Sequence, residues 1–172
     1  MSNMTSREYG PSGVYVIECI NPRKNKYRIR WDFQPFELDG DEKLVSFIEV
    51  EVKYKPTMLE VKDIILSWYN ETTDKAILSG FKWKDMPVWL SSENQFNYKA
   101  AYDLAFQTNG ASLPTVFKFG TTEEPIYYKF DTLEELQDFY VKAMTYINEQ
   151  LAIGWAKKDN IDWGEYEKAL NL

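Results

Sequence analysis

Apolar and polar residues alternate in the first third of the chain, and this alternation predicts β-strands. In the segment 26–33, every second side chain is apolar (Tyr27, Ile29, Trp31 and Phe33) and the side chains between them are charged. A period of two residues is typical of a strand with one buried face. Residues 13–20 are rich in β-branched side chains. Residues 45–53 alternate again, with one register shift near Ile48 that is typical of a β-bulge.

Turn residues separate these three segments. The run 21–25 contains Asn21 and Pro22 and predicts a turn, and residues 34–43 predict a loop around Asp39-Gly40. We therefore predict a three-stranded antiparallel β meander over residues 13–55. The residues before it, 1–12, are mostly small and polar, so we expect a flexible N-terminus there.

After Pro56 the apolar spacing becomes helical. Thr57 and Glu60 have the spacing of a capping box, which predicts a helix over 58–79 that ends at Gly80. Ser92 and Gln95 have the same spacing at the start of a second helix. That second helix is expected to bury an apolar stripe composed of Phe96, Ala100, Ala101, Leu104 and Ala105.

A third helix is predicted from residue 133 to about 155, with Thr132 and Glu135 as its capping box, and a short terminal helix follows in 160–170. Two short hairpins lie between the helices. One covers 81–90, where Trp83 and Trp89 are expected to pair or cross, and the other covers 115–130. The predicted fold class is α+β, with the N-terminal antiparallel β meander followed by a module of three helices and two short β-hairpins over 57–172.

The charge balance argues against nucleic acid as a partner. The chain has 172 residues with 20 Lys and Arg against 27 Asp and Glu, a net charge of −7. A nucleic-acid binder needs a cationic surface that releases counterions, and the one basic cluster here, around Arg23 and Lys24, is typical of a solvated hairpin. No run of residues approaches the roughly 20 apolar positions of a membrane span, and the first residues lack the apolar core of a signal peptide.

Residue types needed for common catalytic sites are missing from the sequence. It contains no His and one cysteine, Cys19, so it has no Ser-His-Asp triad, no His-ligated metal and no disulfide within the chain. Cys19 lies in an apolar run and is expected to be a small buried side chain. Most carboxylates that a glycosidase pair would need lie at predicted helix starts, where capping explains them better. We therefore expect no enzyme, no cofactor and no metal site.

Aromatic residues are the most informative feature of the composition. They make up 16% of the chain, as 6 Trp, 12 Tyr and 10 Phe. Many of them lie at element ends, so they either fill the seam between the two predicted modules or form a patch for a protein or a sugar. The candidate partner-binding residues are Trp31, Phe33, Phe36, Trp83 and Trp89, of which the first three are expected to form an exposed contact group.

Three segments together carry a resemblance to a known family. They are 80–98, which contains Phe81-Lys82-Trp83 and Ser92-Glu93-Asn94-Gln95, then Phe117-Lys118-Phe119-Gly120, then 130–136 with Leu133-Glu134-Glu135-Leu136. In this order, over about residues 58–160, the chain resembles a domain of unknown function found in phage and prophage proteins encoded with tail and tail-fibre genes. The resemblance implies a virion or assembly protein and carries no catalytic residues.

The first hypothesis is a non-enzymatic phage structural or assembly protein that contacts other phage proteins or itself, with a homo-oligomer as one form. It would be present in the host cytoplasm during assembly. It would then either remain in the virion or act only as an assembly chaperone. Two alternatives stay open: a small acidic inhibitor of a host protein, whose complex would weaken with salt, and an aromatic carbohydrate-binding module.

Overall fold

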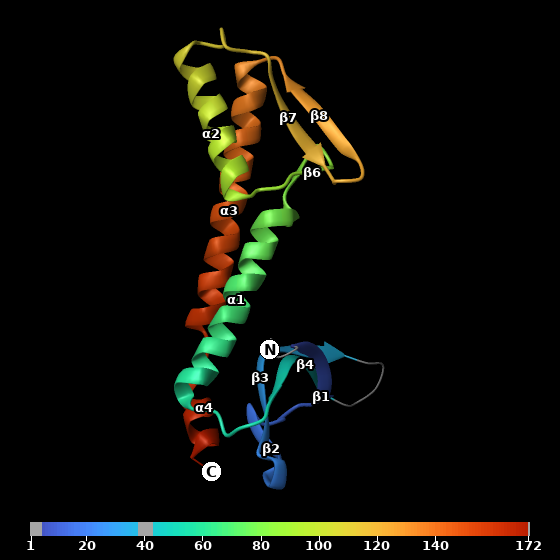
Figure 1. Ribbon diagram of the computed structural model, residues 1–172, viewed down its shortest axis with the longest axis vertical. Coiled ribbons are helices and arrows are strands. Elements are labelled where there is room, and N and C mark those ends of the chain that lie inside the picture. Colours follow the sequence, from blue (N-terminus) through green and yellow to red (C-terminus); the bar gives the residue numbers. More distant parts are fainter. Residues whose placement is uncertain (1–4, 38–42, 172) are drawn as a thin grey trace. The chain divides into compact units, whose positions relative to one another are not determined.

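The computed structural model describes residues 5–37 and 43–171, and over these the protein has the predicted α+β class (Figure 1). The Asp39-Gly40 turn lies outside the described residues. The strands are β1 (Ser6–Pro11), β2 (Ile17–Asn21), β3 (Lys26–Glu37), β4 (Lys43–Val52), β5 (Lys82–Trp83), β6 (Met86–Pro87), β7 (Thr115–Gly120) and β8 (Pro125–Phe130). The α-helices are α1 (Met58–Gly80), α2 (Ser92–Gln107), α3 (Leu133–Asp159) and α4 (Trp163–Leu170), and Pro22–Lys24 form the 3-10 helix η1.

The chain divides into two compact units. Unit 1 consists of residues 1–68 and 160–172, and unit 2 of residues 69–159. This division differs from the predicted modules 13–55 and 57–172, because the terminal helix α4 belongs with the N-terminal sheet. Tyr166 of α4 is buried, and its hydroxyl donates a hydrogen bond of 2.8 Å to the carbonyl oxygen of Arg30 in β3.

The sheet of unit 1 has four strands in the order β1-β4-β3-β2, all antiparallel, rather than three. Residues 6–11, predicted as part of a flexible N-terminus, form the edge strand β1 instead. Arg7 forms an ion pair with Asp32 of β3 and donates to Ser46 Oγ of β4 at 3.2 Å, so side chains as well as the strand ladder hold β1 in place.

An irregularity near Ile48 is confirmed, but the extra residue lies in β3. The register changes between the pairs Trp31–Ile48 and Gln34–Ser46, so Asp32 and Phe33 together lie opposite one residue of β4. Asp32 adopts a positive φ of 54° at this point. The two-residue alternation of β3 therefore changes phase here, which a strict pattern does not reveal.

One face of this sheet is apolar and buried. Its fully buried side chains include Ile29, Trp31, Val50 and Val52, and Val61 and Ile65 of α1 are equally buried. The capping box at the start of α1 is confirmed: the Thr57 N–H donates to Glu60 Oε2 at 2.7 Å, and the Glu60 N–H donates to Thr57 Oγ1 at 3.3 Å. The hydrogen bond from the Thr57 backbone lowers the pKa of Glu60.

Unit 2 has an aromatic core. In Figure 1, α2 and α3 lie side by side, and the hairpin β7–β8 lies against them. Phe139 of α3 is fully buried, and its ring lies 5.1–6.3 Å from those of Phe81, Trp83, Tyr98, Phe117, Phe119 and Phe130. Rings at these separations gain stability beyond the area they bury. Both predicted hairpins, the third helix and the terminal helix are present.

Two predictions for α2 are wrong. Ser91, not Ser92, caps this helix, since its hydroxyl accepts from the Asn94 N–H at 3.2 Å, while the Gln95 side chain donates to the Leu90 carbonyl oxygen. The buried face also differs from the predicted stripe. Tyr98 and Ala105 are buried and Tyr102 stacks on Tyr140 of α3 at 4.8 Å, whereas Phe96, Ala100 and Leu104 are exposed.

Candidate functional site

The three aromatic residues predicted as a contact group in unit 1 do not form one surface. Trp31 is only 1% exposed and packs edge-on against Trp68 with ring centroids 5.8 Å apart. Phe36 lies against Tyr9 at 4.7 Å, and Phe33 lies against Phe47 at 5.6 Å. Tyr9 pairs in register with Ser46, the neighbour of Phe47, so the two ring pairs lie on opposite faces of the sheet.

The two predicted tryptophans of unit 2 also have different environments. Trp83 is 3% exposed, pairs in register with Met86 and belongs to the aromatic core, so it does not pair with Trp89. Trp89 follows β6 and is 50% exposed. Of the five candidates, Trp31 and Trp83 are therefore core residues, and Trp89 is the most exposed.

Trp89 lines an open cleft of about 590 Å³, here called the Trp89 cleft. Its walls come from the end of α1, the β6–α2 connection and the turn end of β7. The apolar part consists of Pro87, Val88 and Phe119, and the polar part of Ser79, Asn94, Lys118, Thr121, Thr122 and Glu123. A cleft that combines an exposed aromatic ring with a few polar groups is typical of a binding site.

Local hydrogen bonds fix the shape of this cleft. Asn94 Nδ2 donates to the Trp89 carbonyl oxygen at 2.7 Å, which ties the β6–α2 connection to the helix that follows. On the other wall, the Glu124 N–H donates to Thr121 Oγ1 at 3.0 Å, and the Thr121 N–H donates to the Glu124 carbonyl oxygen at 3.1 Å. Gly120 has a φ of 83°, and a Cβ there would lie 2.3 Å from the Glu124 carbonyl oxygen, so this turn requires glycine.

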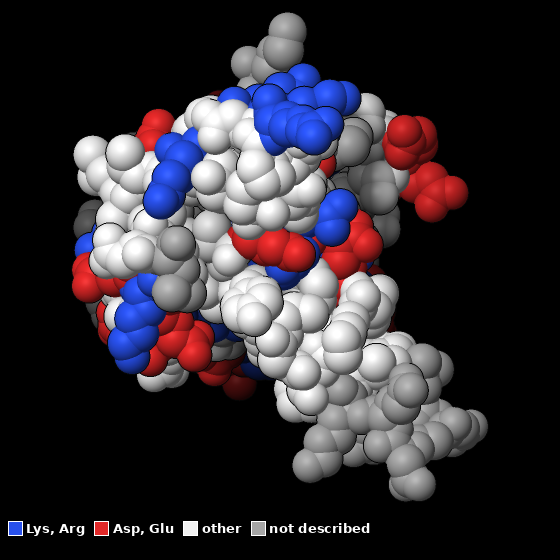
Figure 2. All heavy atoms as spheres, turned by 90° about the horizontal axis from the view of Figure 1, so that it is seen from below, with Lys and Arg blue, Asp and Glu red and all other residues white. Residues whose placement is uncertain are grey.

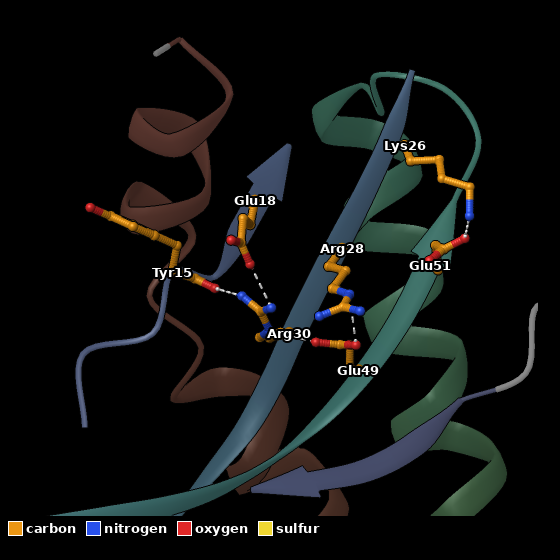
Figure 3. Close-up of polar contacts among 7 residues, drawn as sticks. All are labelled: Tyr15, Glu18, Lys26, Arg28, Arg30, Glu49 and Glu51. Atoms are coloured by element: carbon orange, nitrogen blue, oxygen red, sulfur yellow. Dashed lines mark hydrogen bonds and ion pairs between the residues drawn. The ribbon is translucent and has the colours of Figure 1, made fainter. Parts of the chain in front are cut away.

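A ladder of ion pairs covers the polar face of the sheet in unit 1 (Figure 3). Arg30 is almost fully buried; it donates to Glu49 and Glu18, each at 2.7 Å, and to the Tyr15 carbonyl oxygen at 3.0 Å. Arg28 also pairs with Glu49, at 3.1 Å. These charged side chains form ion pairs with one another across β2, β3 and β4.

The ladder ends in an exposed pair, Lys26 and Glu51, whose nitrogen and oxygen are 2.5 Å apart. The hydrogen bond from Lys26 lowers the pKa of Glu51. On the face shown in Figure 2, acidic and basic side chains lie together with a large uncharged area. That face therefore carries charges of both signs.

A second polar group joins three elements of unit 2. Lys84 Nζ donates to Glu135 Oε1 at 2.5 Å and to Tyr128 Oη at 2.7 Å, and Tyr128 Oη donates to the same Glu135 oxygen at 2.5 Å. The hydrogen bond to Glu135 raises the pKa of Lys84, and the bond from Lys84 lowers that of Glu135. We call these three side chains the clamp of unit 2, because they join the β5–β6 turn to β8 and α3.

Glu135 thereby differs from its predicted role. Thr132 does accept from the Glu135 N–H at 3.3 Å, as a cap should, but the Glu135 carboxylate bonds to Lys84 and Tyr128. Cys19, predicted to be buried, is exposed at the edge of the sheet in β2. Both misses arise from tertiary neighbours that a local pattern does not contain.

Within residues 5–37 and 43–171, no group of three or more His, Cys, Asp or Glu side chains is placed to hold a metal ion. No helix in those ranges is both long enough and apolar enough to cross a bilayer.

Comparison with family models, with curated proteins and with solved structures finds no match to this chain. Sequence reasoning identified Trp89 but missed the partners that complete its cleft, such as Asn94 and Lys118. The sequence carries no signal for them, because the turn after β7 and the start of α2 meet only in the folded unit.

Proposed function

We propose that this chain is a non-enzymatic phage structural or assembly protein, associated with the tail or tail fibre, that acts through protein–protein contacts. The phage setting rests on the resemblance of residues 58–160 to the phage tail-associated domain. The mode of action rests on the Trp89 cleft, where a half-exposed tryptophan lies beside apolar walls and a few polar groups. Tryptophan is enriched among the residues that dominate protein-binding energies.

The charged residues support contact rather than chemistry. Arg28, Arg30 and Glu49 are paired in the sheet of unit 1, and Lys84 and Glu135 are paired in unit 2. General acid–base catalysis needs a titratable group that is free to exchange a proton with a substrate. In the Trp89 cleft the ionisable side chains are Lys118 and Glu123, which suit the polar rim of an interface.

The test compares Trp89→Ala with Trp155→Ala, since Trp155 is also about half exposed and lies outside the cleft. The tagged chain is quantified by mass spectrometry in purified virions and in tail-assembly intermediates of the phage that encodes it. We expect the wild-type chain and Trp155→Ala in one of these fractions, and a reduction of about tenfold or more for Trp89→Ala. Absence of the wild-type chain from both fractions would contradict the proposal, as would equal amounts of the two variants.

The same cleft also favours a second candidate, a carbohydrate-binding module. A sugar needs an aromatic face for its apolar side and amide, hydroxyl or carboxylate groups for its hydroxyls, and Trp89, Asn94, Thr122 and Glu123 offer these. A glycan array separates the two candidates. Binding that is lost with Trp89→Ala and kept with Trp155→Ala supports the sugar, and a blank array with the wild-type chain contradicts it.

A further inference from the structure

The strand β7 has one edge without a partner strand. Within the described residues, β7 pairs only with β8, and no hydrogen bond joins the main chain of Val116 or Lys118 to any other element there. An edge of this kind presents N–H and C=O groups to any chain that approaches in an extended conformation.

The hydrogen-bond pattern of the β7–β8 hairpin indicates which groups of β7 point outward. At its turn, the Thr121 N–H donates to the Glu124 carbonyl oxygen at 3.1 Å. Along an antiparallel ladder, residue pairs that exchange hydrogen bonds alternate with pairs that do not. Counting back from this turn, Phe119 exchanges hydrogen bonds with β8, whereas Lys118 and Val116 do not. The N–H and C=O groups of Lys118 and Val116 therefore point away from β8.

The Trp89 cleft lies along this unpaired edge. Its lining includes Lys118 and Phe119, which are consecutive in β7, so their side chains point to opposite faces of the hairpin. A cleft that both side chains line must border the edge of the strand between the two faces. No residue of β8, all of which is described, lines the cleft, so the edge in question is the unpaired one. The lining also includes Pro87, Val88 and Trp89, which supply apolar groups beside that edge.

We propose that the Trp89 cleft binds an extended segment of a partner protein, which adds to β7 as a third strand through the outward N–H and C=O groups of Val116 and Lys118. This inference rests on the proposed function and names the chemistry of the partner. The outward groups of the two residues lie about 7 Å apart, which is the two-residue repeat of any extended main chain. That repeat favours a peptide over a sugar as the occupant of the cleft.

The side chains around the edge indicate the sequence of the segment. We take the added strand as antiparallel, because this pairing is the more stable one. A side chain opposite Lys118 then lies on the exposed face of the hairpin, where a carboxylate is favoured beside the lysine. The next side chain lies opposite Phe119 and points into the apolar part of the cleft. The expected segment therefore alternates acidic and apolar residues.

The first experiment uses an array of overlapping peptides of about 12 residues, long enough for one strand, from the tail and tail-fibre proteins of the phage that encodes the chain. The wild-type chain is expected to bind at least one of them, and each N–H of that peptide is then methylated in turn. Since alternate N–H groups of an added strand face β7, a loss of about tenfold or more is expected at every second position. Equal effects at neighbouring positions, or no bound peptide on the array, would overturn the inference.

The second experiment changes the edge itself. Lys118→Pro removes an outward N–H that the hairpin does not use, and Tyr127→Pro is the matched control, because Tyr127 lies opposite Lys118 and its N–H points to the other edge. Binding of the array peptide is expected to fall about tenfold or more in Lys118→Pro and to stay unchanged in Tyr127→Pro. Lys118→Ala keeps the N–H and is expected to lose less binding than Lys118→Pro. Equal binding by the two proline variants would overturn the inference.

Hydrogen–deuterium exchange gives a readout that does not depend on the folding of a variant. In the wild-type chain, the amides of Val116 and Lys118 are expected to exchange more slowly when the peptide is bound, and unchanged exchange at both would overturn the inference. The proposed function fails separately, if the chain is absent from virions and tail-assembly intermediates. If the chain is present there and depends on Trp89, but the edge tests fail, only the added strand is wrong.

Discussion

The two units use their side chains in different ways. The sheet of unit 1 buries one face under α1 and α4 residues and covers much of the other with paired charges such as Arg28, Arg30 and Glu49. Unit 2 buries an aromatic cluster around Phe139, yet it leaves Trp89, Phe96 and Leu104 exposed. The comparison indicates that unit 1 pairs charged side chains with one another across its sheet, whereas unit 2 has an exposed tryptophan beside a cleft that is suited to a partner.

The largest effect is expected from the aromatic core of unit 2. Phe139→Ala removes a ring that is fully buried among other rings, and large-to-small changes of this kind cost about 3–5 kcal/mol of unfolding free energy. Tyr127→Ala, at an exposed aromatic position in β8, is the control and is expected to change stability by less than about 0.5 kcal/mol. Urea unfolding followed by circular dichroism measures both, and similar costs for the two variants would show that the cluster does not hold unit 2 together.

The corresponding test in unit 1 separates Trp31 from Phe33. Trp31→Ala should cost about 3 kcal/mol, because it leaves a cavity beside Trp68, whereas Phe33→Ala should cost about 1 kcal/mol. Melting temperatures measure both variants. An unchanged melting temperature for Trp31→Ala, with partner binding lost, would instead restore the sequence-based expectation that Trp31 is a contact residue.

A smaller effect is expected within the ion-pair ladder. Glu49→Gln removes the charge that faces Arg28 and the buried Arg30, and a hydrogen bond to a charged group contributes about 1.5–3 kcal/mol. Glu51→Gln alters only the exposed pair with Lys26 and should change stability less. Denaturant midpoints for the two variants test this order. A larger loss of stability for Glu51→Gln would contradict this order, because it would mean that burial does not determine how much each ion pair stabilises the sheet.

The smallest effect concerns pH and the clamp of Lys84, Tyr128 and Glu135. The pKa of Glu135 in the folded chain is below its ordinary value of 4.5, so its stabilising contribution is present above pH 4.5 and is lost as pH falls through the lowered pKa. In Glu135→Gln the melting temperature should therefore fall less steeply as the pH is lowered, whereas Glu134→Gln should leave this slope unchanged. If the melting temperature of Glu135→Gln fell with pH as steeply as that of the wild type, the clamp would contribute nothing to stability.

Local patterns predicted most elements, and they failed where tertiary contacts decide. The alternation over 26–31 and the Thr57–Glu60 capping box are local features, and both correspond to the observed structure. The predicted position of Phe33 on the same face as Trp31 is wrong, because the extra residue in β3 changes the phase of the alternation. Strand β1 was missed because Ser6–Pro11 is polar and contains Gly10 and Pro11, and only its pairing with β4 makes it a strand.

The exposed stripe of α2 was missed for a related reason. Phe96, Ala100 and Leu104 have the spacing of a buried face, but Tyr98 and Ala105 on the other side are the ones that pack. Apolar periodicity identifies a helix face that needs covering, and it does not say whether the same chain covers it. The phage assignment and the partner were not tested by these features and stay predictions.

The central claim is that partners bind unit 2 and leave the charged face of unit 1 free. Hydroxyl-radical footprinting of the chain, alone and within purified tail assemblies, compares Trp89 of unit 2 with Tyr15 of unit 1, both exposed in the isolated chain. We expect Trp89 to lose most of its reactivity in the assembly while Tyr15 keeps it. Protection of Tyr15 with unchanged oxidation of Trp89 would contradict the claim.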